Sequence, residues 1–204
     1  MLPSLAFLLA ALVLAVTPGP GIAYVVARTA AGGRAEGLAS CVGTGLGGMF
    51  HVCAAALGLS VLLAQSATAF SVVKYVGAAY LLYLGVRLLL AKAPAVVEAV
   101  ASGARRALLE GVLVEALNVK TALFFLAFLP QFLVSGSSPV PQLVVMGTVC
   151  VLLNTLVDVV AVLGAARLLQ SGHAAQRRAR ILTKVSGVTL VSLGLYVAAA
   201  RRGT

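Results

Sequence analysis

Thr17-Pro18-Gly19-Pro20-Gly21 interrupts the first long apolar stretch of the chain, which runs from Leu5 to Ala27. Each proline lacks a backbone N–H and clashes with the preceding turn, so one continuous helix cannot pass through this motif. In a bilayer, the freed backbone groups are tolerated where they are buried in protein or line a wet cavity. The motif therefore predicts a broken membrane helix with a solute or ion site at the break. A kink without any site is the simpler alternative.

The composition indicates a membrane protein with an all-α fold. The 204 residues are 61% hydrophobic and 10% charged, with a mean hydropathy of +1.09, whereas soluble domains carry about a quarter charged residues. A spanning helix needs roughly 20 apolar residues. We predict six spans in a single integral membrane domain, residues 1–204: Leu5–Ala27, Leu38–Leu63, Val72–Leu90, Gly111–Val134, Leu143–Ala166 and Ile181–Ala200.

The positive charges are distributed unevenly among the predicted loops. With the N-terminus outside, the inner loops hold most of the 15 Lys and Arg residues: Arg28, Arg34, Arg87, Lys92, Arg105, Arg106, Arg167, Arg177, Arg178, Arg180 and Lys184. The outer side holds Lys74, Arg201 and Arg202. This positive-inside pattern predicts a multi-pass membrane protein with both termini outside. We therefore expect the net charge of +10 to set the topology and to contact anionic lipid headgroups, and not to bind nucleic acid.

The basic loop from Ala91 to Glu110 divides the chain into halves of three predicted spans each. The fourth span, like the first, has a polar interruption, Asn118-Val119-Lys120-Thr121. Because three is an odd number, the two halves would have opposite orientations, as in transporters built from inverted repeats. We therefore predict pseudo-repeats at about 1–92 and 108–202, with substrate contacts at the two breaks.

Ionisable side chains inside the predicted spans are candidate transport residues, because burying them in a membrane is costly. Asp158 lies near the middle of the fifth span, with Asn154 one turn earlier on the same face. Glu115 and Asn118 share a face near the inner end of the fourth span, and Lys120 lies nearly halfway along it. We predict that Asp158 couples transport to protons; a structural hydrogen bond to another helix is the alternative. An ion pair between Lys120 and Asp158 would compensate both charges.

Other groups carry weaker signals. His51 could relay protons, although a lone histidine on an apolar helix is more often structural. Gly43 and Gly47 form a GxxxG pair, which predicts close helix contact within the chain or between two copies in a homodimer. The odd number of cysteines within the predicted spans, without CxxC spacing, predicts small structural hydrophobic residues: Cys41, Cys53 and Cys150.

The sequence contains no HExxH, GxSxG or Walker A motif. This predicts a protein that is not an enzyme and requires no cofactor or resident metal. It would transport a small molecule either driven by an ion gradient or down the molecule's own gradient. Two alternatives remain. One is a metal or small-ion exporter with His51, Asp158 and the cysteines as ligands. The other is a subunit that transports nothing and uses the Gly43/Gly47 face to bind a partner.

In their order and spacing, these motifs resemble the LysE/RhtB family of bacterial amino-acid exporters over essentially the full chain. The likeness is carried by Thr17–Gly21, Gly43–His51, Gly77–Leu81 with Leu84-Gly85, Asn118–Lys120 with Phe128–Phe132, Asp158, and Lys184–Gly194. The resemblance implies a six-span inner-membrane exporter of amino acids or derivatives, driven by the proton gradient. The family's Asn-Pro-Lys motif has Val119 at its middle position here, which predicts a less sharply broken fourth span.

Overall fold

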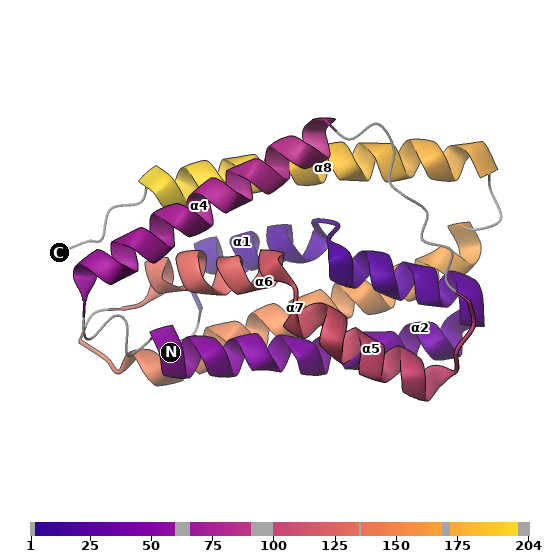
Figure 1. The fold of residues 1–204 in the computed structure, drawn as a ribbon, viewed down its shortest axis with the longest axis horizontal. Helices are drawn as coiled ribbons and strands as arrows, with labels where there is room; N and C mark the ends of the chain where they lie inside the picture. The colour runs from indigo at the N-terminus through magenta and orange to yellow at the C-terminus, as the bar shows by residue number, and fades with distance from the viewer. Residues whose placement is uncertain (1–2, 60–65, 91–99, 135, 169–171, 200–204) are drawn as a thin grey trace.

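The computed structural model describes residues 3–59, 66–90, 100–134, 136–168 and 172–199. Every regular element in these ranges is helical (Figure 1). The α-helices are α1 (Leu5–Val16), α2 (Pro20–Ala54), α4 (Ala67–Leu90), α5 (Ala104–Ala116), α6 (Val119–Leu123), α7 (Pro139–Leu168) and α8 (Gly172–Ala199). Two π-helical turns, η1 (Ala55–Leu59) and η2 (Phe124–Phe128), and a 3-10 turn, η3 (Leu129–Phe132), complete the list. The predicted loop charges Lys92, Arg201 and Arg202 lie outside the described residues.

The predicted break in the first span is confirmed, and its two prolines have different places. Ser4 caps α1 by accepting a hydrogen bond from the backbone N–H of Phe7, and the helix ends at Thr17 in extended backbone. Pro18 lies within the break, whereas Pro20 is in the first turn of α2, where a missing N–H costs nothing. The first predicted span is therefore two helices in series.

The prediction of a loop between Ala27 and Leu38 is wrong, because α2 stays helical on both sides of one residue, Gly33. Gly33 has φ 73° and ψ −166°, a backbone conformation that only glycine adopts without strain. At this point the helix turns back, and its second half runs alongside the first (Figure 1). Glu36, which lies between the first two predicted spans, is consequently buried, with 5% of its surface exposed.

The fourth predicted span is also two pieces. α5 ends at Ala116, and α6 begins at Val119 after a bend of 41°. The break forms without proline, and at it the Asn118 side chain accepts a hydrogen bond from the Lys120 N–H at 3.1 Å. A capping side chain of this kind starts a new helix without any proline. The rest of the segment is the aromatic run Phe124–Phe132, which forms much of the apolar core.

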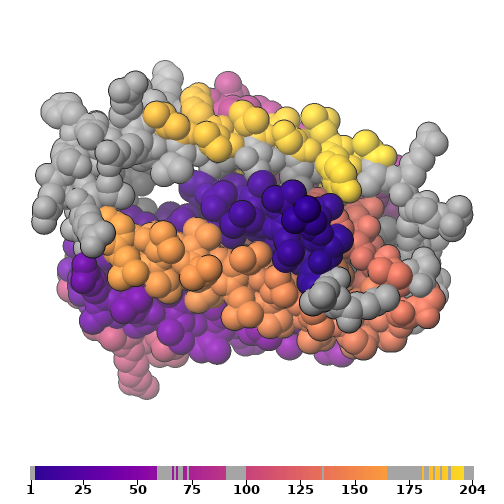
Figure 2. All heavy atoms as spheres, turned by 180° about the vertical axis from the view of Figure 1, so that it is seen from behind, coloured from indigo at the N-terminus to yellow at the C-terminus, as the bar shows by residue number. Residues whose placement is uncertain are grey.

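The helices pack in two groups. α4 and α8 lie side by side along one edge of the molecule (Figure 1), and their contact is close because Gly85 and Gly187 face each other. On the opposite face, α1 lies between α7 and α8 (Figure 2). The second half of α2 packs against α5 through Gly43 and Gly47, so the GxxxG pair serves contact within the chain.

Replacing Gly43 by Ala is expected to destabilise the protein by about 1–3 kcal/mol, as overpacking does. The added methyl group would overlap the backbone carbonyl of Leu108 on α5, which cannot move without shifting that helix. Gly58→Ala is the matched control, because no atom of the described residues lies within 4 Å of its added methyl group. Thermal unfolding followed by circular dichroism suits a chain that lacks Trp. Equal midpoints for both variants would contradict the close α2–α5 contact.

Two helical segments in the described residues are long and apolar enough to cross a membrane, within Pro20–Gly58 and Pro139–Gly164, or three if the bent pair α5–α6 counts as one span. The number falls below the six predicted spans partly because breaks divide them. α1 has 12 residues and is therefore roughly 18 Å long, too short for a hydrocarbon core of about 30 Å. The protein is thus all-helical in its described part, with more than one candidate span.

Candidate functional site

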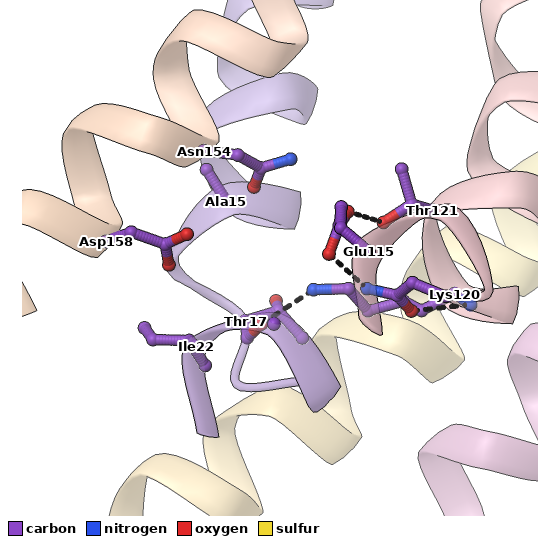
Figure 3. A pocket seen from close by; sticks show the side chains of 10 residues that line it. Ala15, Thr17, Ile22, Glu115, Lys120, Thr121, Asn154 and Asp158 are labelled. Carbon is purple, nitrogen blue, oxygen red and sulfur yellow. Dashed lines mark hydrogen bonds between the residues drawn. The ribbon is translucent and has the colours of Figure 1, made fainter. Parts of the chain in front are cut away.

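The two helix breaks meet inside the protein. The Lys120 ammonium, from the first turn of α6, donates hydrogen bonds to the backbone carbonyls of Thr17 at 2.9 Å and Leu14 at 3.4 Å. Lys120 is buried, with 8% of its surface exposed, and Figure 3 shows it reaching toward the end of α1. Carbonyls at a helix C-terminus carry partial negative charge and favour a cation. The end of α1 therefore provides a cation site that the chain's own lysine fills.

The glycine between the two prolines makes room for this lysine. A Cβ atom on Gly19 would lie 3.0 Å from both Cε and Nζ of Lys120. The motif at Thr17–Gly21 consequently has two roles. Its prolines stop one helix and begin the next, and its first glycine lets the lysine of the other break approach the backbone.

Glu115 lies on the other side of the break, at the end of α5. Its Oε2 accepts a hydrogen bond from the Asn118 side-chain amide at 2.9 Å, and its Oε1 accepts one from the Thr121 hydroxyl at 2.7 Å. The same carboxylate lies against the first turn of α2, where a Cβ on Gly21 would be 2.6 Å from Oε2. Helix N-termini favour negative charge. Glu115 is 7% exposed, so our placement of it near the inner end of a span underestimated its burial.

Asp158 enters from α7. Its Oδ2 accepts a hydrogen bond from the Thr44 hydroxyl of α2 at 2.9 Å, and 6% of its surface is exposed. The predicted ion pair with Lys120 is wrong for this conformation: the ion pairs in the described residues join other groups. Lys120 is held by carbonyls instead, although both side chains border one cavity (Figure 3).

A cavity of about 20 Å³ lies where these elements converge. This is enough for roughly one water molecule. Its lining comes from both breaks and from α7: Ala15, Thr17, Gly21, Ile22, Glu115, Asn118, Lys120, Thr121, Asn154 and Asp158. The cavity therefore joins most of the predicted site residues, and a solute larger than water would need the surrounding helices to separate.

His51 and the cysteines lie apart from this cavity lining. The His51 Nε2 atom is 2.8 Å from the backbone oxygen of Glu115, a contact that supports the end of α5. Cys41 and Cys150 are buried, whereas Cys53 is exposed. Among the described residues, no three His, Cys, Asp or Glu side chains are grouped so that they could hold a metal ion.

The sequence analysis missed a second buried cluster, which surrounds Arg28. Its guanidinium donates to the Tyr24 hydroxyl at 3.2 Å, to the Ser102 hydroxyl at 2.8 Å and to the Glu110 carboxylate. Glu36 lies 3.8 Å from the same guanidinium and accepts hydrogen bonds from the backbone N–H groups of residues 102 and 103. The cluster fastens the start of α5 to α2, beside a cavity of about 660 Å³.

Arg28→Gln is expected to cost about 3–5 kcal/mol of stability, because it leaves the buried Glu36 carboxylate without its cation. Arg106→Gln is the matched control. It removes the same charge from the same Glu110 carboxylate, but 71% of the Arg106 side chain is exposed, and exposed pairs contribute about 0–1 kcal/mol. Circular dichroism melting of both variants checks this, and similar losses would mean that the Arg28 cluster is not a stabilising contact.

Two hydroxyls of the site were also missed: Thr44, which holds Asp158, and Thr121, which holds Glu115. A threonine in an apolar helix gives little signal by itself, because it often bonds its own backbone, as Thr29 does here. For Thr121 a signal was present, since it directly follows the polar run Asn118–Lys120.

The fold and the site together define a class: a helical, multi-pass membrane protein whose two interrupted helices meet at buried charges. The chain belongs to the LysE type translocator family, whose model matches residues 12–201. It is thus a multi-pass bacterial membrane translocator and not an enzyme. No solved structure gives a significant match to the chain.

Named relatives cover most of the chain. An uncharacterized membrane protein of Vibrio cholerae is 32% identical over 75% of this chain and 76% of its own length. The homoserine/homoserine lactone efflux protein of Salmonella typhimurium is 29% identical over 96% of each chain. The leucine efflux protein of Klebsiella pneumoniae is 27% identical over 98% of this chain and 94% of its own length.

Proposed function

We propose that this chain is a secondary transporter that exports amino acids or related small metabolites in exchange for protons. The observation that carries the proposal is the meeting of two broken helices at a buried cavity bordered by Glu115, Lys120 and Asp158. Broken helices whose ends face a central polar site are the usual binding architecture of secondary transporters. The efflux of homoserine and leucine by relatives supports the cargo class.

The proposed architecture has six spans arranged as a 3+3 inverted repeat. In support, each half contains the same order of elements: a broken helix, then two further helices. The first break, after α1, contacts the second, before α6, through Lys120 and Thr17. We place the pseudo-repeats at about 1–92 and 108–202, within one domain of 204 residues.

The proposed orientation puts the basic loops in the cytoplasm and both termini outside, in the inner membrane. In support, α1 begins and α8 ends at one end of the molecule, whereas the Gly33 turn and the start of α5 lie at the other (Figure 1). The second end contains the basic residues Arg34 and Arg105, which the positive-inside rule favours in the cytoplasm.

Single cysteines placed at Ser137 and Arg178 test this orientation, in a chain whose three native cysteines are replaced. A membrane-impermeant thiol reagent added to intact cells should label position 137 and spare position 178. Labelling of both positions after the membrane is permeabilised is the control. Labelling of 178 alone in intact cells would invert the proposed topology.

Nothing in the described residues favours the alternative of a metal or small-ion exporter. His51 contacts a backbone oxygen, and the side chains proposed as ligands of the ion do not form a group. The face proposed to bind a partner is not accessible, because α5 covers Gly43 and Gly47. If the protein forms a homodimer, the contact must use another face.

The cargo class is tested in cells that express the chain and are fed dipeptides, which raise internal amino-acid concentrations. At least one member of a broad amino-acid panel should leave these cells faster than cells without the chain. Cells with an equally abundant Asp158→Asn protein are the control and should not show the increase. If no panel member leaves faster, the proposed cargo class is wrong.

A further inference from the structure

Two of the three ionisable side chains at the central cavity are already satisfied by the chain itself. Lys120 donates to the carbonyls of Thr17 and Leu14 at the end of α1. Both oxygens of Glu115 accept hydrogen bonds, from Asn118 and Thr121. The cation-favouring end of α1 and the anion-favouring start of α2 are thereby each matched by an internal charge.

Asp158 differs from both. Its Oδ2 accepts a hydrogen bond from Thr44, while its Oδ1 has no hydrogen-bond partner among the described residues. Asn154, one turn earlier on α7, borders the cavity with an amide that likewise has no partner in that part of the chain. Figure 3 shows both side chains on α7 at the cavity, facing the break between α1 and α2. The site thus offers one carboxylate oxygen and one amide to an incoming group.

The charges around Asp158 limit what that group can be. Lys120 on α6 and Glu115 on α5 face it across the cavity, and Cys41 lies near it on α2. With the lysine and both carboxylates ionised, the cavity has one net negative charge. An uncompensated buried charge is costly, so either one proton or one ammonium group restores neutrality within the cavity, and both together would exceed it.

The size of the cavity agrees with the binding of one positive group at a time. About 20 Å³ accommodates one water molecule, and an ammonium group is of similar size. The rest of an amino acid would enter only when the helices separate, but its ammonium group fits the space already present beside Asp158.

We propose that Asp158 and Asn154 form a single cation site that holds the cargo's ammonium group and a proton in turn. This inference rests on the proposed function and defines its substrate class as primary ammonium compounds, whether or not they carry a carboxylate. In each cycle, one proton from outside replaces one departing cargo molecule on Asp158 and is released inside when the next cargo binds. A cargo carboxylate finds no free cation at the site, because Lys120 is engaged by α1.

The test measures thermal stabilisation of the purified full-length protein in lipid nanodiscs by three pools of compounds. The first pool contains homoserine and the standard amino acids other than lysine, arginine and proline, the second their α-carboxamides and the third their N-acetyl derivatives. At pH 6.5 the α-amino groups of the first two pools are protonated. Both should raise the unfolding midpoint by about 3 °C at concentrations several times their dissociation constants, and the third pool should not raise it.

Two variants and a pH series complete the design. Asp158→Asn should lose stabilisation by both ammonium pools, and the remote Arg106→Gln should keep it. Lowering the pH should weaken the stabilisation of the native protein, because protons compete for the same carboxylate. The comparison of pools needs only the native chain, so it remains decisive if Asp158→Asn fails to fold.

Each result has a distinct meaning. Stabilisation by the amino acids without the carboxamides would overturn the inference and leave the proposed function standing, because the cargo carboxylate would then be required. Stabilisation by the N-acetyl pool, or pH-independent stabilisation by the amino acids, would overturn it as well. Failure of the amino-acid pool with the native protein would contradict both the inference and the proposed cargo class.

Discussion

Asp158→Asn is expected to abolish proton-driven export while the protein stays folded and abundant. The amide keeps the shape of the side chain and can still accept the hydrogen bond from Thr44, but it can neither bind a proton nor carry a charge. The ammonium group of the bound cargo would lose its opposite charge in the cavity, and losing a buried charge partner costs about 3–5 kcal/mol. This corresponds to at least a 100-fold loss in rate or affinity at about 1.4 kcal/mol per tenfold.

Everted membrane vesicles provide the measurement, because in them an exporter accumulates its cargo when protons are pumped inward. Uptake of radiolabelled amino acids should depend on the pH gradient for the native chain and fall to background for Asp158→Asn. Arg106→Gln, at the exposed edge of the Arg28 cluster, controls for expression and insertion. If Asp158→Asn still accumulates an amino acid in a pH-dependent way, another residue couples the protons.

Lys120→Met is expected to lower both stability and transport. Without the ammonium, the carbonyl of Thr17 loses its buried donor, at a cost of about 1–3 kcal/mol, whereas that of Leu14 loses the lysine but keeps the Thr17 N–H. Glu115 and Asp158 would also be left at the cavity without a positive charge between them. We therefore expect a loss of about 2–5 kcal/mol and transport at background level.

Lys184→Met is the matched control, because its ammonium also donates to a helix carbonyl, that of Leu89, but at an exposed position. Substitutions at exposed positions usually change stability by about 0.5 kcal/mol or less. Unfolding midpoints from circular dichroism and the vesicle uptake assay separate the two variants. A native midpoint for Lys120→Met would show that the lysine does not hold the two breaks together.

The features that the sequence predicted well are those determined locally. The break at Thr17–Gly21 follows from the backbone chemistry of proline, and the interruption at Asn118 follows from a side chain that bonds the next turn. The burial of Asp158 follows from its place in a long apolar stretch. In each case a few consecutive residues contain the whole physical cause.

The features that the sequence did not predict depend on contacts between distant segments. From the sequence, Lys120 could pair either with a buried carboxylate or with the carbonyls at a helix end. The packing of α1 against the second break brings the carbonyls of Thr17 and Leu14 to the lysine. The burial of Glu36 depends on the turn at Gly33. The charged residues around this glycine are typical of a loop, although the chain is helical on both sides of it. Such choices are made by tertiary structure, and no local periodicity encodes them.

The central claim is that buried charges at the meeting of the two breaks exchange protons for amino acids. The most direct test uses the purified protein in liposomes preloaded with an amino-acid mixture and a pH-sensitive dye, followed by acidification of the outside. The account predicts that acid outside accelerates the loss of at least one amino acid, and that the interior acidifies in step with it. Loss of amino acids at a rate independent of the pH gradient, or no loss at all, would contradict it.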